Sequence, residues 1–170
     1  MLSFMAMKDI AIYPESVLKK RAEEVENIDF EIINLVKDME DTMYAAPGVG
    51  LAAPQVSVSK RLILVDPTGH KDSGKLIVMV NPEIIEEEGQ DTAGEMCLSV
   101  PELQVDVPRA TRILVRGYDL DGKELRFEAE GFLARIFQHE IDHLNGITIA
   151  EYASSLKRSI YLKKRKKGKI

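Results

Sequence analysis

The stretch Gln138-His139-Glu140-Ile141-Asp142-His143 closes an apolar run that begins at Gly131, and it decides how the rest of the chain is interpreted. A helix turns about 100° per residue, so His139 and His143 stand one turn apart on the same face. Their two imidazoles are therefore aimed at one point. Glu140 leans toward the same side and remains free to move protons. This HExxH pattern is typical of metal hydrolases, although a helix carrying two solvated histidines has the same pattern.

The single cysteine, Cys97, narrows the choice of further metal ligands. It excludes an intramolecular disulfide and fits a reducing compartment, and it could be a buried bystander, a nucleophile or a ligand. The third histidine, His70, lies in a polar loop, where we expect an exposed bystander. If His139 and His143 bind a metal, Cys97 is the only strong soft ligand left in the chain. Three protein ligands with one open position would indicate a catalytic rather than a structural site.

Length and composition indicate an ordinary globular protein. With 170 residues, 45% of them hydrophobic and 30% charged, the chain can bury its own core, and we expect one domain over 1–170. No run approaches the roughly 20 apolar residues of a membrane span. The N-terminal segment 1–7 is too short for a signal peptide. We therefore expect a cytoplasmic protein with no membrane partner.

The remaining pattern predicts an α+β fold, with antiparallel sheets packed around the HExxH helix. An N-terminal helix is expected from the N-cap Asp29 to about Ala46, and a C-terminal helix is expected over 152–162. Asp119–Gly122 is a strong hairpin signal, and Asn145-Gly146 suits the end of the HExxH helix. Strand-like runs occupy 61–66, 76–80, 104–107, 111–118 and 123–129.

Charge is concentrated at the C-terminus. The net charge is -5, yet residues 163–169 hold six basic groups and no acid. The simplest interpretation of this basic tail, 163–170, is a solvated charged end. Clustered cations of this kind could also contact the phosphates of ribosomal RNA.

Three segments together resemble the signature motifs of the peptide deformylase family. They are Gly48-Val-Gly-Leu-Ala-Ala-Pro-Gln55, Glu95-Met-Cys-Leu-Ser99 and Gln138-His-Glu-Ile-Asp-His143, in the right order and with suitable spacing. The similarity covers nearly the whole chain, from about Ile10 to Tyr152. It implies hydrolysis of the N-formyl group from N-formylmethionyl nascent peptides of bacteria or organelles, with release of formate.

The resemblance also implies roles for individual residues. The family's metal ligands fall on Cys97, His139 and His143. Its general base and acid, which acts on metal-bound water, falls on Glu140. Its oxyanion donors fall on the Gln55 side chain and the Leu98 backbone N–H, and an uncharged amide is well suited to hold developing negative charge. The family further implies one divalent ion, with Fe2+ as the physiological metal and Zn2+, Ni2+ or Co2+ as substitutes.

Four residues are expected to contact the substrate. Gly50 resembles the position at which the family's backbone pairs with the extended substrate, as an added strand would. Val49, Phe132 and Ile136 are candidates for lining the methionine side-chain pocket, because the last two lie seven and three residues before His139. A plain core role is an equally good interpretation of these three.

One position departs from the family pattern, which usually has glycine or another small residue before the ligand cysteine. This chain has Met96 there. If the position requires a positive φ, methionine is strained. If it faces the cleft, it narrows the cleft.

Two other functions remain compatible with these residues. One is a general HExxH metallopeptidase, which commonly takes a histidine or glutamate as its third ligand. The other is a catalytically weak homologue that binds the ribosome or RNA. Members of the peptide deformylase family are thought to work near the nascent-chain exit, so the basic tail 163–170 is also a candidate ribosome contact of an active deformylase.

Overall fold

The computed structural model describes residues 7–170, so most of the N-terminal segment 1–7 lies outside the described residues. Within 7–170 the chain forms three α-helices and seven strands, joined by short 3-10 turns. The helices are α1 (Phe30–Ala45), α2 (Gly131–Leu144) and α3 (Ser155–Lys166). The strands are β1 (Gly50–Ala52), β2 (Leu62–Val65), β3 (Ile77–Glu88), β4 (Asp91–Cys97), β5 (Val100–Arg109), β6 (Arg112–Tyr118) and β7 (Glu124–Glu130).

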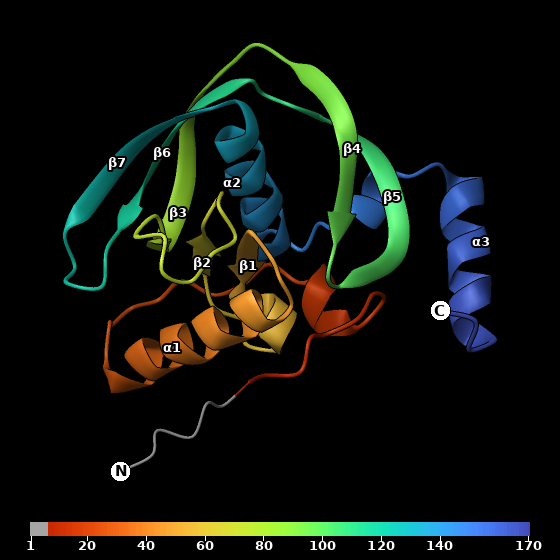
Figure 1. Ribbon diagram of the computed structural model, residues 1–170, viewed down its shortest axis with the longest axis horizontal. Helices are drawn as coiled ribbons and strands as arrows, with labels where there is room; N and C mark the ends of the chain where they lie inside the picture. Colours follow the sequence, from red (N-terminus) through yellow and green to blue (C-terminus); the bar gives the residue numbers. More distant parts are fainter. Residues whose placement is uncertain (1–6) are drawn as a thin grey trace.

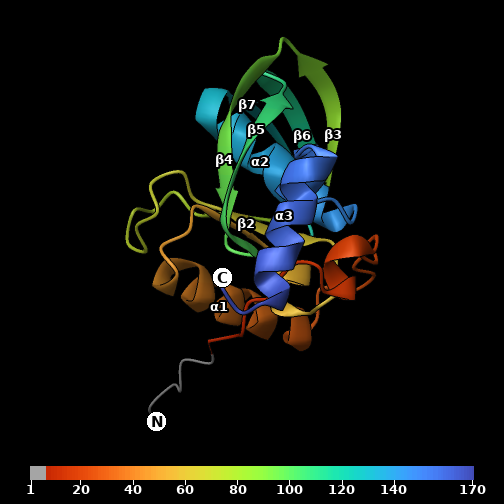
Figure 2. The ribbon, with the colours of Figure 1, turned by 90° about the vertical axis from the view of Figure 1, so that its right-hand side faces the viewer.

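The strands form two antiparallel sheets on either side of α2 (Figure 1). The larger sheet has the order β1-β2-β3-β6-β7, and the smaller one pairs β4 with β5. Figure 2, turned by 90°, also shows α2 behind the β4–β5 ribbon. The predicted α+β architecture around a central HExxH helix, with a helix near each end of the chain, is confirmed.

Apolar packing explains why α2 is central. Its buried side chains, among them Phe137 and Ile141, join buried residues of β2, β3, β6 and β7 in one hydrophobic cluster. Helix α1 packs in a second cluster with β1 and β2. A third cluster joins β5 to the segment around Tyr13 and to Tyr161 of α3. At about 25 cal/mol per Å² of apolar surface, these clusters supply the main driving force for folding.

The helix ends follow the sequence signals. Asp29 caps α1, because its Oδ1 accepts a hydrogen bond from the Ile32 N–H at 3.1 Å. After α2, Gly146 adopts a φ of 75°. A Cβ at this position would lie 2.7 Å from the Lys19 carbonyl, so only glycine allows this close approach. Arg61 of the neighbouring loop donates to the Leu144 carbonyl at 2.8 Å and satisfies the C-terminal end of α2.

Three features differ from the sequence-based expectations. Strand β4 was not predicted, because its polar and small residues lack an apolar alternation and it forms by pairing with β5. Strand β3 continues through Pro82 with a register shift between Val80 and Glu83, where a proline is tolerated. The motif-bearing loop 48–55 contains the short strand β1 and the start of a 3-10 turn.

The C-terminal helix is also shifted from its predicted range of 152–162. Ser154 caps α3 by accepting from the Lys157 N–H at 3.1 Å, so the helix begins at Ser155. It continues through Lys166, well into the basic tail. Tyr161 is buried and donates to the Pro101 carbonyl at 3.0 Å, and Ile170 folds back against the same cluster. Because of this packing, the C-terminal tail 163–170 folds against the body of the protein, whereas its composition alone suggests a solvated end.

Among the described residues, the helices are all too short or too polar to cross a lipid bilayer.

Candidate metal centre and catalytic cavity

Two different layers bring the predicted metal ligands together. Cys97 ends β4, whereas His139 and His143 extend from one face of α2. The candidate ligand atoms of the three residues all lie within 4.8 Å of one another. The Cys97 Sγ is 3.3 Å from His143 Nε2, and the two imidazole centroids are 5.1 Å apart. The three residues are thus clustered as a metal site requires.

The chemistry of this cluster fits a divalent transition metal. A thiolate with two neutral imidazoles is a common donor set for such ions. The Nδ1 of His139 is held 2.8 Å from a Glu95 carboxylate oxygen, which leaves its Nε2 for a metal. Burial lowers the pKa of His143 well below its usual value and so favours the neutral form that coordinates metals.

Glu95 organises the surroundings of His139, a role that the sequence interpretation missed. Its buried carboxylate accepts two hydrogen bonds from Arg109, at 2.9 and 3.0 Å, and one from Arg135 at 2.6 Å. Burial alone would raise the pKa of Glu95, but the hydrogen bonds from His139 and Arg109 outweigh it and lower the pKa to about 2. Glu95 is therefore an anion that orients a candidate ligand.

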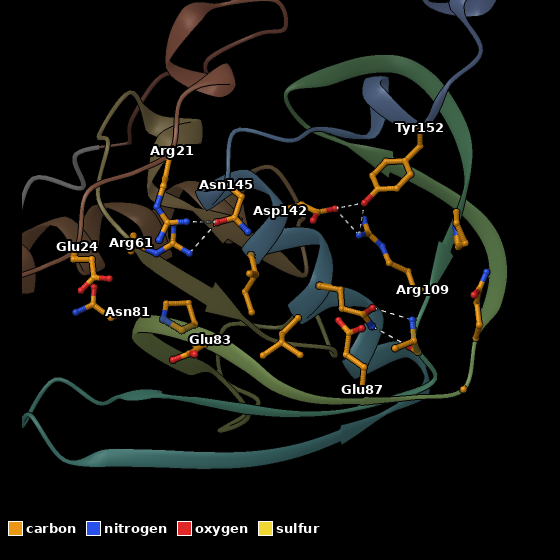
Figure 3. Close-up of a pocket in the computed structure, with 18 residues that line it drawn as sticks. Arg21, Glu24, Arg61, Asn81, Glu83, Glu87, Arg109, Asp142, Asn145 and Tyr152 are labelled. Carbon is orange, nitrogen blue, oxygen red and sulfur yellow. Dashed lines mark hydrogen bonds and ion pairs between the residues drawn. The ribbon is translucent and has the colours of Figure 1, made fainter.

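Arg109 is itself fixed from the other side of the molecule. Its Nη1 lies 2.5 Å from Asp142 Oδ2, and the Tyr152 hydroxyl donates to the same oxygen at 2.8 Å (Figure 3). One sequence signal could have identified this arginine. On β5 the buried residues alternate, and Arg109 continues the inward-facing series Leu103, Val105 and Val107. A charge at an inward position requires a buried partner.

Gln55 lies beside the metal cluster with its amide orientation fixed. Its side chain is 2% exposed, and its Oε1 accepts from the Ala52 N–H at 2.9 Å. Its Nε2 consequently faces the cluster, 3.2 Å from Ser99 Oγ and 3.6 Å from Cys97 Sγ. Leu98, the other predicted oxyanion donor, occupies the tight turn between β4 and β5 and lines the same cavity.

Glu140 is buried against Gly50. Its side chain is 4% exposed, and its Oε2 has no hydrogen-bond partner among the residues the structure describes. Burial raises the pKa of Glu140 to about 7, although His139, when it is protonated, and the Arg109 guanidinium act in the opposite direction. A Cβ on residue 50 would lie 2.6 Å from Glu140 Oε1, so the absence of a side chain at Gly50 makes room for this carboxyl group.

These groups open into a cavity of about 450 Å³. Its lining includes all four predicted substrate-contacting residues, Val49, Gly50, Phe132 and Ile136. Ile136 is buried, whereas Phe132 is 58% exposed at the rim. Met96 also lines the cavity and is 67% exposed, and its φ is not in the positive region. The possible backbone strain at Met96 is therefore absent. His70 is exposed, as expected, and is not part of the cavity lining.

A larger polar crevice of about 770 Å³ lies against a different face of α2 (Figure 3). Arg21 and Arg61 meet there at the Asn145 side chain, which accepts from them at 3.2 and 3.1 Å. The crevice contains none of the predicted site residues. Arg109 lines it and reaches Glu95 on the catalytic side.

A helix that presents two histidines and a buried glutamate to a cysteine, with an oriented amide alongside, is typical of the metal-dependent hydrolases. Comparison with known proteins identifies the class further. The chain belongs to the peptide deformylase family, whose model, described as polypeptide deformylase, matches residues 7–159.

Individual relatives agree with this assignment. The peptide deformylase of Thermodesulfovibrio yellowstonii is 47% identical over 165 residues, which cover 97% of this chain and 100% of that protein. A crystal structure of a peptide deformylase from Legionella pneumophila superimposes with a TM-score of 0.90 at 44% identity and covers 96% of each chain. A peptide deformylase from Ehrlichia chaffeensis, in complex with actinonin, gives a TM-score of 0.89 at 38% identity over 96% of this chain and 98% of that one.

The activity follows from the family. The chain is a hydrolase of protein biosynthesis that removes the formyl group from the N-terminal methionine of nascent peptides. The family is metal-dependent, and the Cys-His-His cluster could bind the ion. The alternative of a general metallopeptidase is set aside by this result.

Proposed function

We propose that the chain hydrolyses formyl-methionyl peptides in the 450 Å³ cavity, with one divalent metal ion held by Cys97, His139 and His143. The observation that carries this proposal is the clustering of the three ligand groups within 4.8 Å, beside an unpartnered oxygen of Glu140. A bound divalent ion would act as a Lewis acid that activates a water molecule.

Glu140 is proposed as the general base and acid. It would accept a proton from the attacking water and later return one to the amine nitrogen that leaves as formate forms. Its buried Oε2 is available for this role because it makes no hydrogen bond with the described residues.

Gln55 and Leu98 are proposed as oxyanion donors. The Ala52 N–H fixes the Gln55 amide so that its N–H group points toward the cluster. The Leu98 backbone N–H lies in the adjoining turn. Such donors stabilise the oxygen of the tetrahedral intermediate, and each is typically worth about 2.7–4 kcal/mol in the transition state.

The substrate is proposed to bind in an extended conformation against Gly50. Strand β1 pairs only with β2 among the described strands, so its second edge is available for an added strand. Val49, Phe132 and Ile136 would then surround the methionine side chain. The methionine pocket is supported by the presence of all three in the cavity lining.

The metal is proposed to be Fe2+ in the cell, with Zn2+, Ni2+ and Co2+ as working substitutes. The donor set suits all four ions, and the family resemblance favours iron. The decisive experiment prepares the protein anaerobically and measures its metal content together with formate release from formyl-Met-Ala-Ser. Activity should follow the iron content. Cleavage inside an ordinary blocked peptide, with no formate from the formyl peptide, would contradict the proposed function.

We also propose that 1–170 forms one domain whose basic tail 163–170 contacts the ribosome. Helix α3 supports this second proposal, because Lys163, Lys164 and Lys166 of its last turn are all exposed. The proposed compartment is the cytoplasm of a bacterial-type cell, which is supported by the bacterial relatives and by the presence of a single cysteine in the sequence.

A further inference from the structure

Met96 stands on the opposite side of β4 from the groups that hold the metal site. The pairing of β4 with β5 shifts register between Glu95 and Cys97, yet both neighbours of Met96 still contact the histidines of α2. Glu95 is 7% exposed and contacts His139, and Cys97 approaches His143. Met96, between them, is 67% exposed and still lines the catalytic cavity. The apolar side chain of Met96 therefore borders the cavity at the exposed face of β4.

The cavity is bordered by two strand edges that could pair with a peptide. Strand β4 pairs only with β5, and β1 pairs only with β2, within the described part of the chain. Gly50 of β1 and the end of β4 both line the cavity. An extended peptide between them would add a strand, as the proposed function requires, and this inference rests on that proposal.

Strand alternation then decides where each substrate side chain points. The methionine that bears the formyl group must point inward, toward Phe132 and Ile136 of α2, if these residues line its pocket. The second residue must point to the opposite face, which is the face of Met96. Neighbours on the same face of paired strands bring their Cβ atoms to about 4.5–5.5 Å, within reach of a methionine side chain.

We propose that Met96 contacts the second residue of the substrate and makes the enzyme favour peptides with an apolar residue after methionine. The unbranched thioether adapts to differently shaped apolar partners. Met96 is thus a specificity-determining residue of the cavity.

The test compares kcat/KM for formyl-Met-Leu-Ser, formyl-Met-Phe-Ser and formyl-Met-Ser-Ser, using the metal-loaded protein. For the native enzyme, kcat/KM should be about fivefold higher with leucine than with serine as the second residue. This ratio is the effect expected when a contact with Met96 buries roughly 40 Å² of apolar surface. Met96→Ala should bring this ratio close to one, mainly through KM. Met96→Leu should keep the preference.

Met7→Ala is the matched control. Met7 is 64% exposed, nearly as much as Met96, but it does not line the cavity, so its removal should leave the ratio unchanged. A leucine-to-serine ratio that is the same in Met96→Ala and the native enzyme would overturn the inference. Absence of formate from all three peptides would instead contradict the proposed function.

Discussion

Glu140 and Glu95 line the same cavity as His139, yet their surroundings give them opposite properties. Glu95 accepts four hydrogen bonds from His139, Arg109 and Arg135 and is held as an anion. Glu140 has an unpartnered oxygen in a buried position, which raises its pKa to about 7. One carboxylate is thus suited to orient a ligand, and the other is suited to exchange protons.

Replacement of the proposed base should separate metal binding from catalysis. Glu140→Ala removes the proposed proton-transfer group but none of the three candidate ligands, so the variant should keep its metal and lose activity by about 10²–10⁴-fold. Metal content and formate release from formyl-Met-Ala-Ser would be measured on the same sample. Activity that persisted in the metal-loaded variant would show that the mechanism is wrong.

Replacement of Glu95 should weaken the metal site without removing a ligand. In Glu95→Gln, His139 loses its anionic partner, and among the described residues the buried Arg109 keeps only Asp142 as a counter-charge. Metal affinity should fall about 10–100-fold, as measured by competition with a chelator. The exposed Glu26→Gln is the control and should bind metal normally. Unchanged affinity in Glu95→Gln would mean that its contact with His139 does not tune the site.

At the scale of elements, Asp66 connects helix α1 to the loop that follows β2. Its buried carboxylate accepts hydrogen bonds from the Tyr44 hydroxyl at 2.7 Å, from the Thr68 hydroxyl at 2.7 Å and from Ser73 at 2.8 Å. Burial alone would raise the pKa of Asp66, but these bonds lower it from 3.8 to about 2. The ionised form is therefore more stable in the folded than in the unfolded chain.

This shift predicts a specific acid sensitivity. The stabilisation from Asp66, on the order of 2 kcal/mol, should be complete above pH 4 and be lost as the pH falls toward 2. Asp66→Asn should be less stable at pH 7 and show a smaller loss of stability between pH 4 and 2, as measured by urea unfolding. The exposed Asp121→Asn serves as the control. Equal pH dependence in Asp66→Asn and the native protein would contradict this account.

The elements that the sequence predicted well are those with a strong periodic signal. Helices α1 and α2 and the β6–β7 hairpin follow from apolar spacing, the Asp29 cap and the turn ending at Gly122. Strand β4 could not be predicted, because its two inward groups next to the centre, Glu95 and Cys97, are a carboxylate and a thiol rather than an apolar pair. Their inward orientation depends on partners in α2 and β5, which sequence spacing does not reveal.

For the molecule as a whole, the candidate metal ligands could be predicted from the sequence because the chain contains few cysteine and histidine residues. One cysteine and an HExxH pair leave few combinations, and the three residues do meet. The surrounding network of hydrogen bonds and ion pairs could not be predicted in the same way. It runs from Tyr152 and Asp142 through Arg109 to Glu95. It joins residues from four elements, and charged residues are too numerous in the sequence for their pairing to be inferred.

The proposed ribosome contact predicts a salt-dependent interaction. Because Ile170 packs against the body, charge reversal is a cleaner change than truncation. Lys163→Glu combined with Lys167→Glu should weaken co-sedimentation with ribosomes at low salt, since fewer phosphates are neutralised. Formate release from short peptides should be unchanged. Equal co-sedimentation of the variant and native proteins would contradict the proposed ribosome contact of the basic tail.

The candidate ligands come from two layers, so an ion bound by all three would also be a cross-link between these layers. Cys97 belongs to the two-stranded sheet, whereas the histidines belong to the helix that packs on the five-stranded sheet. The free energy of metal binding would therefore stabilise the packing of the β4–β5 sheet against the rest of the molecule.

Removal of the metal should loosen one sheet selectively. Amide hydrogen exchange should accelerate in β4 and β5 after chelation, while β2 and β3 stay protected. The ion pairs of Arg109 and Arg135 would limit the opening. Uniform acceleration in both sheets would argue against a local cross-link. Dissociation of the metal would then cause two defects at once. The enzyme would lose its reactivity, and it would also lose the ordered edge of β4 that is proposed to bind the substrate.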